Sequence, residues 1–259
     1  MEPTLIWILV SVLGGFVLAL LLGRGLVPAL RALKAGQSIR EVGPKWHQGK
    51  AGTPTMGGIV FILSSLLCIV TGWHAMRETG DYKHLLVLAL ALMFGLIGFA
   101  DDFIKVKKKR NLGLTGLQKL VLQVLAACLF LAGMHFTNAL TYDLYIPFVR
   151  EPLVHIPPLV YLALSVFIIV GCVNAVNLTD GIDGLATGVT LPVMLFFTLV
   201  SMTAKQWGLA TFPATLVGAL GGFLFYNFYP AKTFMGDTGS LYLGGAVCGL
   251  AYALDMPLV

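Results

Sequence analysis

Long apolar segments separated by short polar loops run along almost the whole chain. Eight of them are candidate membrane spans, because a span needs about 20 predominantly apolar residues and fewer where polar ends reach the interface. They are apolar on all faces, whereas strands of a membrane barrel would alternate apolar and polar residues. The pattern predicts an all-α, polytopic transmembrane bundle with spans at 5–22, 56–72, 85–100, 117–134, 159–176, 185–202, 209–228 and 241–254.

The composition agrees with a membrane protein and excludes an ordinary soluble domain. Of the 259 residues, 58% are hydrophobic and only 11% are charged, with a mean hydropathy of +0.88. A soluble globular domain carries about 25% charged residues. Residues 1–259 are therefore expected to form a single integral membrane domain. The four cysteines lie inside or at the end of apolar segments without metal-site spacing, which is typical of packing residues.

Basic residues predict the orientation of the bundle. If the chain alternates sides through eight spans, thirteen of its 17 lysines and arginines fall on one side. The positive-inside rule places that side in the cytoplasm. The N-terminus, and with it the other end of this chain, is then expected outside.

The polar motifs gather on this same predicted side. They lie at 43–58, 101–119, 174–188 and 232–240, whereas the loops expected outside carry no comparable constellation. Ionisable groups in so apolar a chain are costly and indicate function by default. Four loops that bring polar groups to one face therefore predict a site at the cytoplasmic edge of the bundle.

The pair Asp101 and Asp102 closes the third apolar segment. Carboxylates at the C-terminus of a helix oppose the helix dipole, which disfavours a purely structural role. A paired carboxylate can bind Mg²⁺, or one member can act as a base while the other binds metal. The alternative is a solvated helix end at which Asp101 pairs with Lys105 one turn later.

Two further motifs carry acids beside span ends. Asn174, Asn177, Asp180 and Asp183 recur every third residue, so that neighbours share a helix face. Capping of the next helix would account for only one of these four residues. Asp237 stands near two glycines before the last apolar segment, where it could cap that helix or bind a metal.

Cationic and hydroxyl candidates accompany these acids. Lys50 and Thr55 lie in a glycine-rich loop that suits contacts to an anionic nucleotide but lacks the residue order of a P-loop. Lys119 lies one turn inside an apolar segment, where a lysine is costly unless it snorkels or meets an anion. The basic run at 105–110 attracts an anionic substrate, contacts anionic headgroups or only sets the topology.

The chain resembles the polyprenyl-phosphate N-acetylhexosamine-1-phosphate transferase superfamily in four motifs that occur in the family's order. The motifs are GTPTMGG at 52–58, DDFIK at 101–105, NAVNLTDGIDGLATG at 174–188 and FMGDTGS at 234–240. GTPTMGG and NAVNLTDG make the resemblance strongest to the phospho-N-acetylmuramoyl-pentapeptide transferases of bacterial peptidoglycan synthesis. The resemblance extends from about residue 43 to about residue 250.

This resemblance implies a reaction at the cytoplasmic side of the bacterial inner membrane. Undecaprenyl phosphate would take the phospho-sugar from uridine-diphosphate N-acetylmuramoyl-pentapeptide, with Mg²⁺ as cofactor and lipid I and UMP as products. The implied partners are these two substrates and membrane lipid, with no nucleic acid. A homodimer is one option for the assembly.

The resemblance also implies roles for individual residues. Asp237 matches the Mg²⁺ ligand, and Asp101 and Asp102 match paired aspartates of which one is proposed as base or nucleophile. These three are the expected catalytic residues. The expected substrate-binding residues, among which Phe234 could stack on uracil and Lys119 lie near the pyrophosphate, are Lys50, Thr55, Lys119, Asn177, Asp180, Asp183, Phe234 and Gly236.

The chain departs from the resembling family in its length. Family members usually have ten spans and a later loop with a run of histidines, so we expect this chain to lack the last two spans. A related N-acetylhexosamine-1-phosphate transferase, a shortened inactive form, a lipid-phosphate binder or flippase, and an ion-coupled transporter remain alternatives. The transporter is disfavoured because the acids lie at span ends rather than mid-span.

Overall fold

The computed structural model describes residues 3–33, 52–77, 80, 82–108, 110, 112–143 and 156–258. Within these ranges the chain forms nine α-helices and no β-strand, which confirms the predicted all-α class. The helices are α1 (Pro3–Ala32), α2 (Ile59–Ser65), α3 (Leu67–Ala75), α4 (Lys83–Lys108), α5 (Gly116–Phe136), α6 (Pro158–Thr179), α7 (Leu185–Thr203), α8 (Trp207–Asn227) and α9 (Gly236–Ala253).

All eight predicted apolar segments are helical, but they are not eight equivalent spans. In the part of the chain that the structure describes, six helices, namely α1 and α4 to α8, are long and apolar enough to cross a membrane. The second segment differs from the expected single span because the helix is interrupted at Leu66, which separates α2 from α3. The last segment is α9, whose 18 residues begin with Gly236 and Asp237 and so start in a polar turn.

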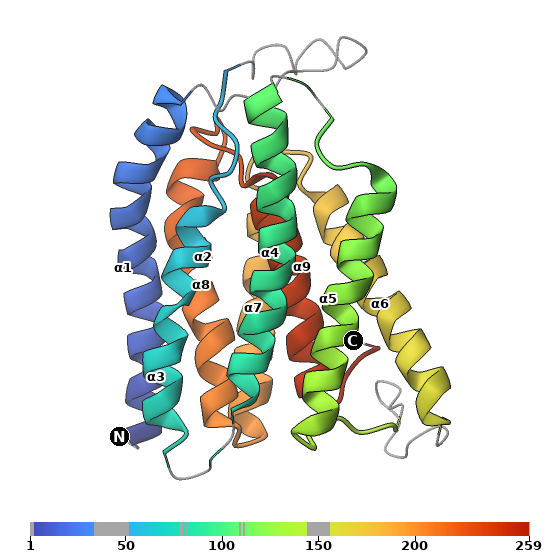
Figure 1. Cartoon of the computed structure of the whole chain (residues 1–259). Helices are drawn as coiled ribbons and strands as arrows, with labels where there is room; N and C mark the ends of the chain where they lie inside the picture. The colour runs from blue at the N-terminus through green and yellow to red at the C-terminus, as the bar shows by residue number, and fades with distance from the viewer. Residues whose placement is uncertain are drawn as a thin grey trace.

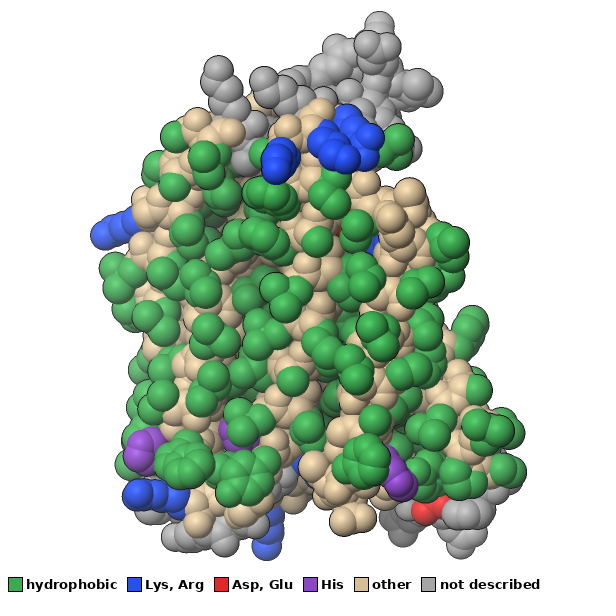
Figure 2. Space-filling model, in the orientation of Figure 1, with side chains coloured by type: hydrophobic (Ala, Val, Ile, Leu, Met, Phe, Trp, Pro, Cys, Tyr) green, Lys and Arg blue, Asp and Glu red, His purple; other side chains and the backbone are tan. Residues whose placement is uncertain are grey.

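The outer surface of the bundle is apolar, as lipid contact requires. Large hydrophobic side chains are exposed along the outer helices, including Leu13 (64%), Leu117 (72%) and Leu159 (79%). Figure 2 shows apolar side chains over the middle of the molecule and basic side chains toward its two ends. Because every backbone polar group of a helix is paired internally, such helices are stable against hydrocarbon.

α9 lies at the centre of the bundle. Almost all of its side chains are buried, and it packs against α4 and α6 (Figure 1). Small residues allow helices in lipid to approach closely, and here a β-carbon on Gly98 of α4 would lie only 2.1 Å from the carbonyl oxygen of Asp237. This close approach brings the C-terminal part of α4 against the first turn of α9.

The helices alternate in direction, so the described polar motifs meet at one end of the molecule. α4, α6 and α8 end where α5, α7 and α9 begin, at the upper end in Figure 1. A capping box fixes the start of α5 there: the Thr115 hydroxyl accepts from the Gln118 amide, and the Gln118 side chain accepts from the Thr115 amide. Lys119 follows directly and is held at the same level.

The pairing of α1 with α8 depends on a second close contact. A β-carbon on Gly218 of α8 would lie 1.8 Å from the carbonyl oxygen of Val12 of α1. This distance is far below any van der Waals contact, so a larger residue must push the two helices apart.

We therefore expect Gly218→Ala to destabilise the folded protein by about 1–3 kcal/mol, as overpacking of a close contact does. The measurement is thermal unfolding in detergent. Gly171→Ala in α6 is the matched control, because a β-carbon there would have no atom within 4 Å. Equal stability of the two variants would contradict the prediction.

Candidate functional site

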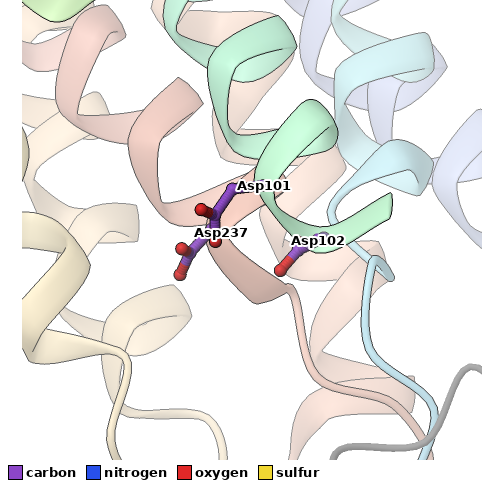
Figure 3. A group of neighbouring side chains, drawn as sticks. All are labelled: Asp101, Asp102 and Asp237. Carbon is purple, nitrogen blue, oxygen red and sulfur yellow. The ribbon is translucent and has the colours of Figure 1, made fainter. Parts of the chain in front are cut away.

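Three carboxylates form a cluster at the upper end of the bundle. Asp101 and Asp102 come from the last turns of α4, and Asp237 comes from the first turn of α9 (Figure 3). One oxygen of each lies within 4.8 Å of one oxygen of each of the others. Asp101 and Asp102 are each only 3% exposed. The structure thus brings together the three predicted catalytic residues.

Asp102 connects α4 to the start of α9. Its Oδ2 accepts hydrogen bonds from the Thr238 amide at 2.9 Å and from the Thr238 hydroxyl at 2.7 Å. The unpaired amides of a helix N-terminus favour such a negative partner. Asp102 therefore caps α9 from a neighbouring helix, and its Oδ1 faces the Lys105 ammonium at 3.8 Å.

Asp101 is held on its other side by the loop between α4 and α5. Its Oδ1 accepts from the Leu114 amide at 2.7 Å, and its Oδ2 pairs with the Lys105 ammonium one turn along α4. The predicted local pair of Asp101 and Lys105 is therefore present. It does not form a solvated helix end, however, because Asp101 is buried.

Asp237 receives hydrogen bonds from three other helices. Its Oδ2 accepts from Lys105 of α4 and from Lys119 of α5, both at 3.0 Å. Its Oδ1 accepts from the Asn177 amide group of α6 at 3.0 Å, and the same amide donates to the Ser240 hydroxyl at 2.7 Å. Lys119 and Asn177, both predicted from sequence, therefore contact the cluster directly.

Lys105 was not among the site residues predicted from sequence, although it belongs there by geometry. Its ammonium contacts Asp101 and Asp237, so it bridges α4 and α9. Its position four residues after Asp101 was the available signal, but that spacing is equally typical of an ordinary helix pair. The contact with Asp237 depends on how α4 and α9 pack.

A second feature absent from the prediction is a contact between two side-chain amides below the cluster. Gln123 of α5 is 1% exposed and accepts from the Asn174 amide group of α6 at 2.8 Å. Gln123 is one turn from Lys119, and Asn174 is about one turn from Asn177. The pair therefore ties α5 to α6 beneath the two residues that donate to Asp237.

Asp180 lies just beyond the end of α6, near the cluster. Burial, together with the negative charges of Asp237 and Asp102, raises the pKa of Asp180 to about 8. A carboxyl group with this pKa is largely protonated at neutral pH. It becomes an anion more readily when a cation enters the site.

Asp183 accepts a hydrogen bond from the backbone between α8 and α9. Its Oδ2 accepts from the Ala231 amide at 3.0 Å, in the segment between α8 and α9. This bond fastens the turn before α7 to the segment that leads to Phe234 and Asp237. Its predicted role in substrate binding stays a prediction.

The glycine-rich loop at 52–58 pairs with the segment before α9. The Phe234 amide donates to the Pro54 carbonyl at 2.9 Å, and the Gly57 amide donates to the Phe234 carbonyl at 2.8 Å. Gly236 has a φ of 70°, a conformation that favours glycine. Lys50, another predicted binding residue, lies outside the described residues.

Thr55 lies beside the cluster with an unsatisfied hydroxyl. The side-chain oxygen is buried and has no hydrogen-bond partner among the described residues, and Thr55 is 4% exposed. A β-carbon on Gly236 would lie 2.6 Å from this oxygen and 2.5 Å from Asp102 Oδ2. The Thr55 hydroxyl is thus placed next to Asp102, where a polar ligand would satisfy it.

The cluster offers carboxylate oxygens that could hold a metal ion. Mg²⁺ prefers hard oxygen ligands such as carboxylates. Leu114 and Thr238 engage one oxygen each of Asp101 and Asp102, and the remaining oxygens of these residues face Lys105. A divalent cation would meet three carboxylates whose charge is now offset by two lysines. The residues present therefore fit the ion that the sequence resemblance implies.

Comparison with known proteins agrees with this arrangement. Residues 84–255 match glycosyl transferase family 4, and residues 50–62 match signature 1 of phospho-N-acetylmuramoyl-pentapeptide-transferase. A protein of that name from Clostridium acetobutylicum is 45% identical over 254 residues, which are 97% of this chain and 77% of the relative. Those from Carboxydothermus hydrogenoformans and Bacillus subtilis are 47% and 46% identical, over 93% and 97% of this chain and 74% and 76% of the relatives.

The chain thus spans about three quarters of the length of these relatives. The two helices that carry the carboxylates, α4 and α9, lie almost entirely within the matched residues 84–255. Identity at this level over nearly the whole chain, together with the signature in the glycine-rich loop, establishes common ancestry and confirms the resemblance inferred from the motifs. The chain belongs to the phospho-N-acetylmuramoyl-pentapeptide-transferase family, within glycosyl transferase family 4.

Proposed function

We propose that this protein transfers phospho-N-acetylmuramoyl-pentapeptide from its uridine diphosphate carrier to undecaprenyl phosphate, giving lipid I and UMP. The reaction takes place at the cytoplasmic face of the bacterial inner membrane and depends on Mg²⁺. The observation that carries the proposal is the convergence of Asp101, Asp102 and Asp237 with two lysines at one end of the bundle. The family membership supports the choice of substrates.

The charges of the site suit a reaction between two phosphorylated substrates. Both substrates are polyanions, and attack of one phosphate on another requires that negative charge be neutralised. Lys105 and Lys119 are each 3.0 Å from Asp237 Oδ2. When a pyrophosphate enters, these ammonium groups move from the carboxylate to the phosphate oxygens.

The carboxylates hold the metal and position the reacting groups. Asp237, with Asp101 and Asp102 beside it, would hold Mg²⁺, which when bound neutralises the pyrophosphate and assists the departure of UMP. Asn177 orients the Asp237 carboxylate through its bond to Oδ1. Asp102 and Asp101 each keep one oxygen that Thr238 and Leu114 do not engage. Either can accept the proton of undecaprenyl phosphate if this substrate arrives protonated.

A lipid-phosphate binder or carrier is the second candidate function. The basic residues and apolar surface would suit it, but a carrier needs no buried cluster of three carboxylates beside the phosphate site. The two functions differ in whether the bond that links UMP to the phospho-sugar is broken. An assay for released UMP detects this difference.

The first test is UMP release from uridine-diphosphate N-acetylmuramoyl-pentapeptide, with and without Mg²⁺ and undecaprenyl phosphate. We expect release only when both are present. Asp237→Asn removes the negative charge that Lys105 and Lys119 contact and that the metal would contact. We therefore expect UMP release to fall about 100-fold or more, which is typical of the loss of one electrostatic contact at a reacting centre. A protein that moves lipid phosphate without releasing UMP, unchanged by this substitution, would be a carrier.

The second test moves Asp237 without changing its chemistry. Gly98→Ala places a β-carbon where the Asp237 backbone carbonyl now lies, so the first turn of α9 must shift relative to α4. A displacement of about 1 Å at a reacting centre can lower the rate about 100-fold. We expect a loss of UMP release of this order, with Gly171→Ala as the control in a helix with free space. Full turnover by the Gly98→Ala variant would show that the α4–α9 distance does not govern the reaction.

The third test distinguishes direct attack by undecaprenyl phosphate from a two-step route through an aspartyl phosphate. We expect direct attack and therefore inversion at a chiral β-phosphorus of the nucleotide substrate. The measurement is the configuration of the phosphorus in the product. Retention would instead support the covalent route through Asp101 or Asp102.

A further inference from the structure

A hollow away from the carboxylate cluster lies between α1 and the end of α8 with the segment that follows it. Its volume is about 470 Å³. Its lining residues, none of which belongs to the carboxylate cluster, are Gly23, Arg24, Val27, Pro28, Arg31, Ala32, Tyr226 and Lys232. The hollow is at the same end of the bundle as the cluster, because α1 ends and α8 ends there (Figure 1).

The described residues that line the hollow include three basic side chains and no acid. Arg24 and Arg31 are seven residues apart on α1, which places them two turns apart on one face. Lys232 approaches from the segment after α8. The ion pairs found among the described residues involve Lys105 and Lys119, not these three. Their charges are therefore available to an anion.

The wall of the hollow is built from fixed groups. The Tyr226 hydroxyl donates to the Leu20 carbonyl of α1 at 2.7 Å. The Tyr226 ring lies where a side chain on Gly23 would be, since a β-carbon there would come within 2.3 Å of it. Val27 is 5% exposed and forms an apolar floor with Pro28. A cationic rim over an apolar floor suits an amphipathic anion.

The surroundings indicate the class of that anion. Below Arg24, the outward face of α1 exposes Leu21 (56%), Val17 (50%) and Leu13 (64%), and α8 exposes Phe225 (62%). In a bilayer these side chains contact acyl chains, while arginines at the end of a span reach the headgroup level. The residues that would contact a headgroup and those that would contact acyl chains therefore follow one another along α1.

We propose that this hollow binds one anionic phospholipid of the adjacent leaflet. Arg24, Arg31 and Lys232 contact the headgroup phosphate, and the acyl chains lie along α1 below Arg24. The Lys232 amide donates to the Tyr226 carbonyl at 2.8 Å, and Lys232 is two residues before Phe234. A bound lipid therefore ties α1 to the segment that leads into the first turn of α9.

The test is native mass spectrometry of the purified chain in neutral detergent, with added phosphatidylglycerol or phosphatidylcholine of the same acyl chains. We expect one phosphatidylglycerol per chain to be retained in preference to phosphatidylcholine. The double substitution Arg24→Gln and Arg31→Gln should weaken phosphatidylglycerol binding about tenfold or more, because each basic residue near the membrane surface adds to the binding free energy for an anionic headgroup. Lys107→Gln with Lys108→Gln, which removes two exposed charges at the same end, should leave it unchanged.

Thermal unfolding provides a second measurement on the unaltered chain. A ligand that binds the folded state raises its unfolding temperature, so phosphatidylglycerol should raise this temperature more than phosphatidylcholine does. If the double variant does not fold, the Lys232→Gln variant is tested in its place, and we expect it to bind phosphatidylglycerol several-fold more weakly than the unaltered chain. Equal binding of the two lipids, equal loss in the Lys107 and Lys108 variant, or displacement by millimolar inorganic phosphate would overturn the proposal.

Discussion

The close contact of α4 with α9 is the constraint on which the rest of the site depends. Asp101 and Asp102 are on one helix and Asp237 is on the other, and they meet only because Gly98 lets the two backbones touch. In lipid, helices gain little from burying apolar surface against each other, so close packing and polar contacts decide which helices pair. The glycine and the Asp102 bonds to Thr238 act together at this crossing.

The polar contacts of the site both join the helices and position the oxygen atoms that a ligand would contact. Asp102 caps α9, Asp101 holds the Leu114 loop, and Asp237 joins α4, α5 and α6. Each carboxylate is therefore positioned by bonds to one part of the fold and keeps oxygen atoms for a ligand. Such pre-organisation reduces the reorganisation needed when a charged substrate and a metal arrive.

The two lysines offset the mutual repulsion of the three acids. Two ammonium groups within 3.0 Å of Asp237 offset repulsion that would otherwise be severe in a buried site. Removing either lysine is then expected to affect both the folded arrangement and the binding of anions. Asp180 is buried beside the negative charges of Asp237 and Asp102, and its pKa is raised for these two reasons.

Much of the fold follows from the sequence alone. Segments near the length of a span that are apolar on all faces predict helices in lipid, and their alternation places every second loop at the same end. The motifs at 101–105, 174–188 and 234–240 could therefore be assigned to one face, as could Lys119 and Asn177.

The tertiary structure decided which of these groups touch. It made Lys105 a bridge to Asp237 as well as a local partner of Asp101, placed Gln123 against Asn174, and joined Arg24, Arg31 and Lys232 in one hollow. It also divided the second apolar segment at Leu66. Periodicity along a chain determines which face of a helix a residue occupies, but contacts between helices depend on their rotation, depth and separation. Those are set by packing at positions such as Gly98 and Gly218, which lie outside the motifs.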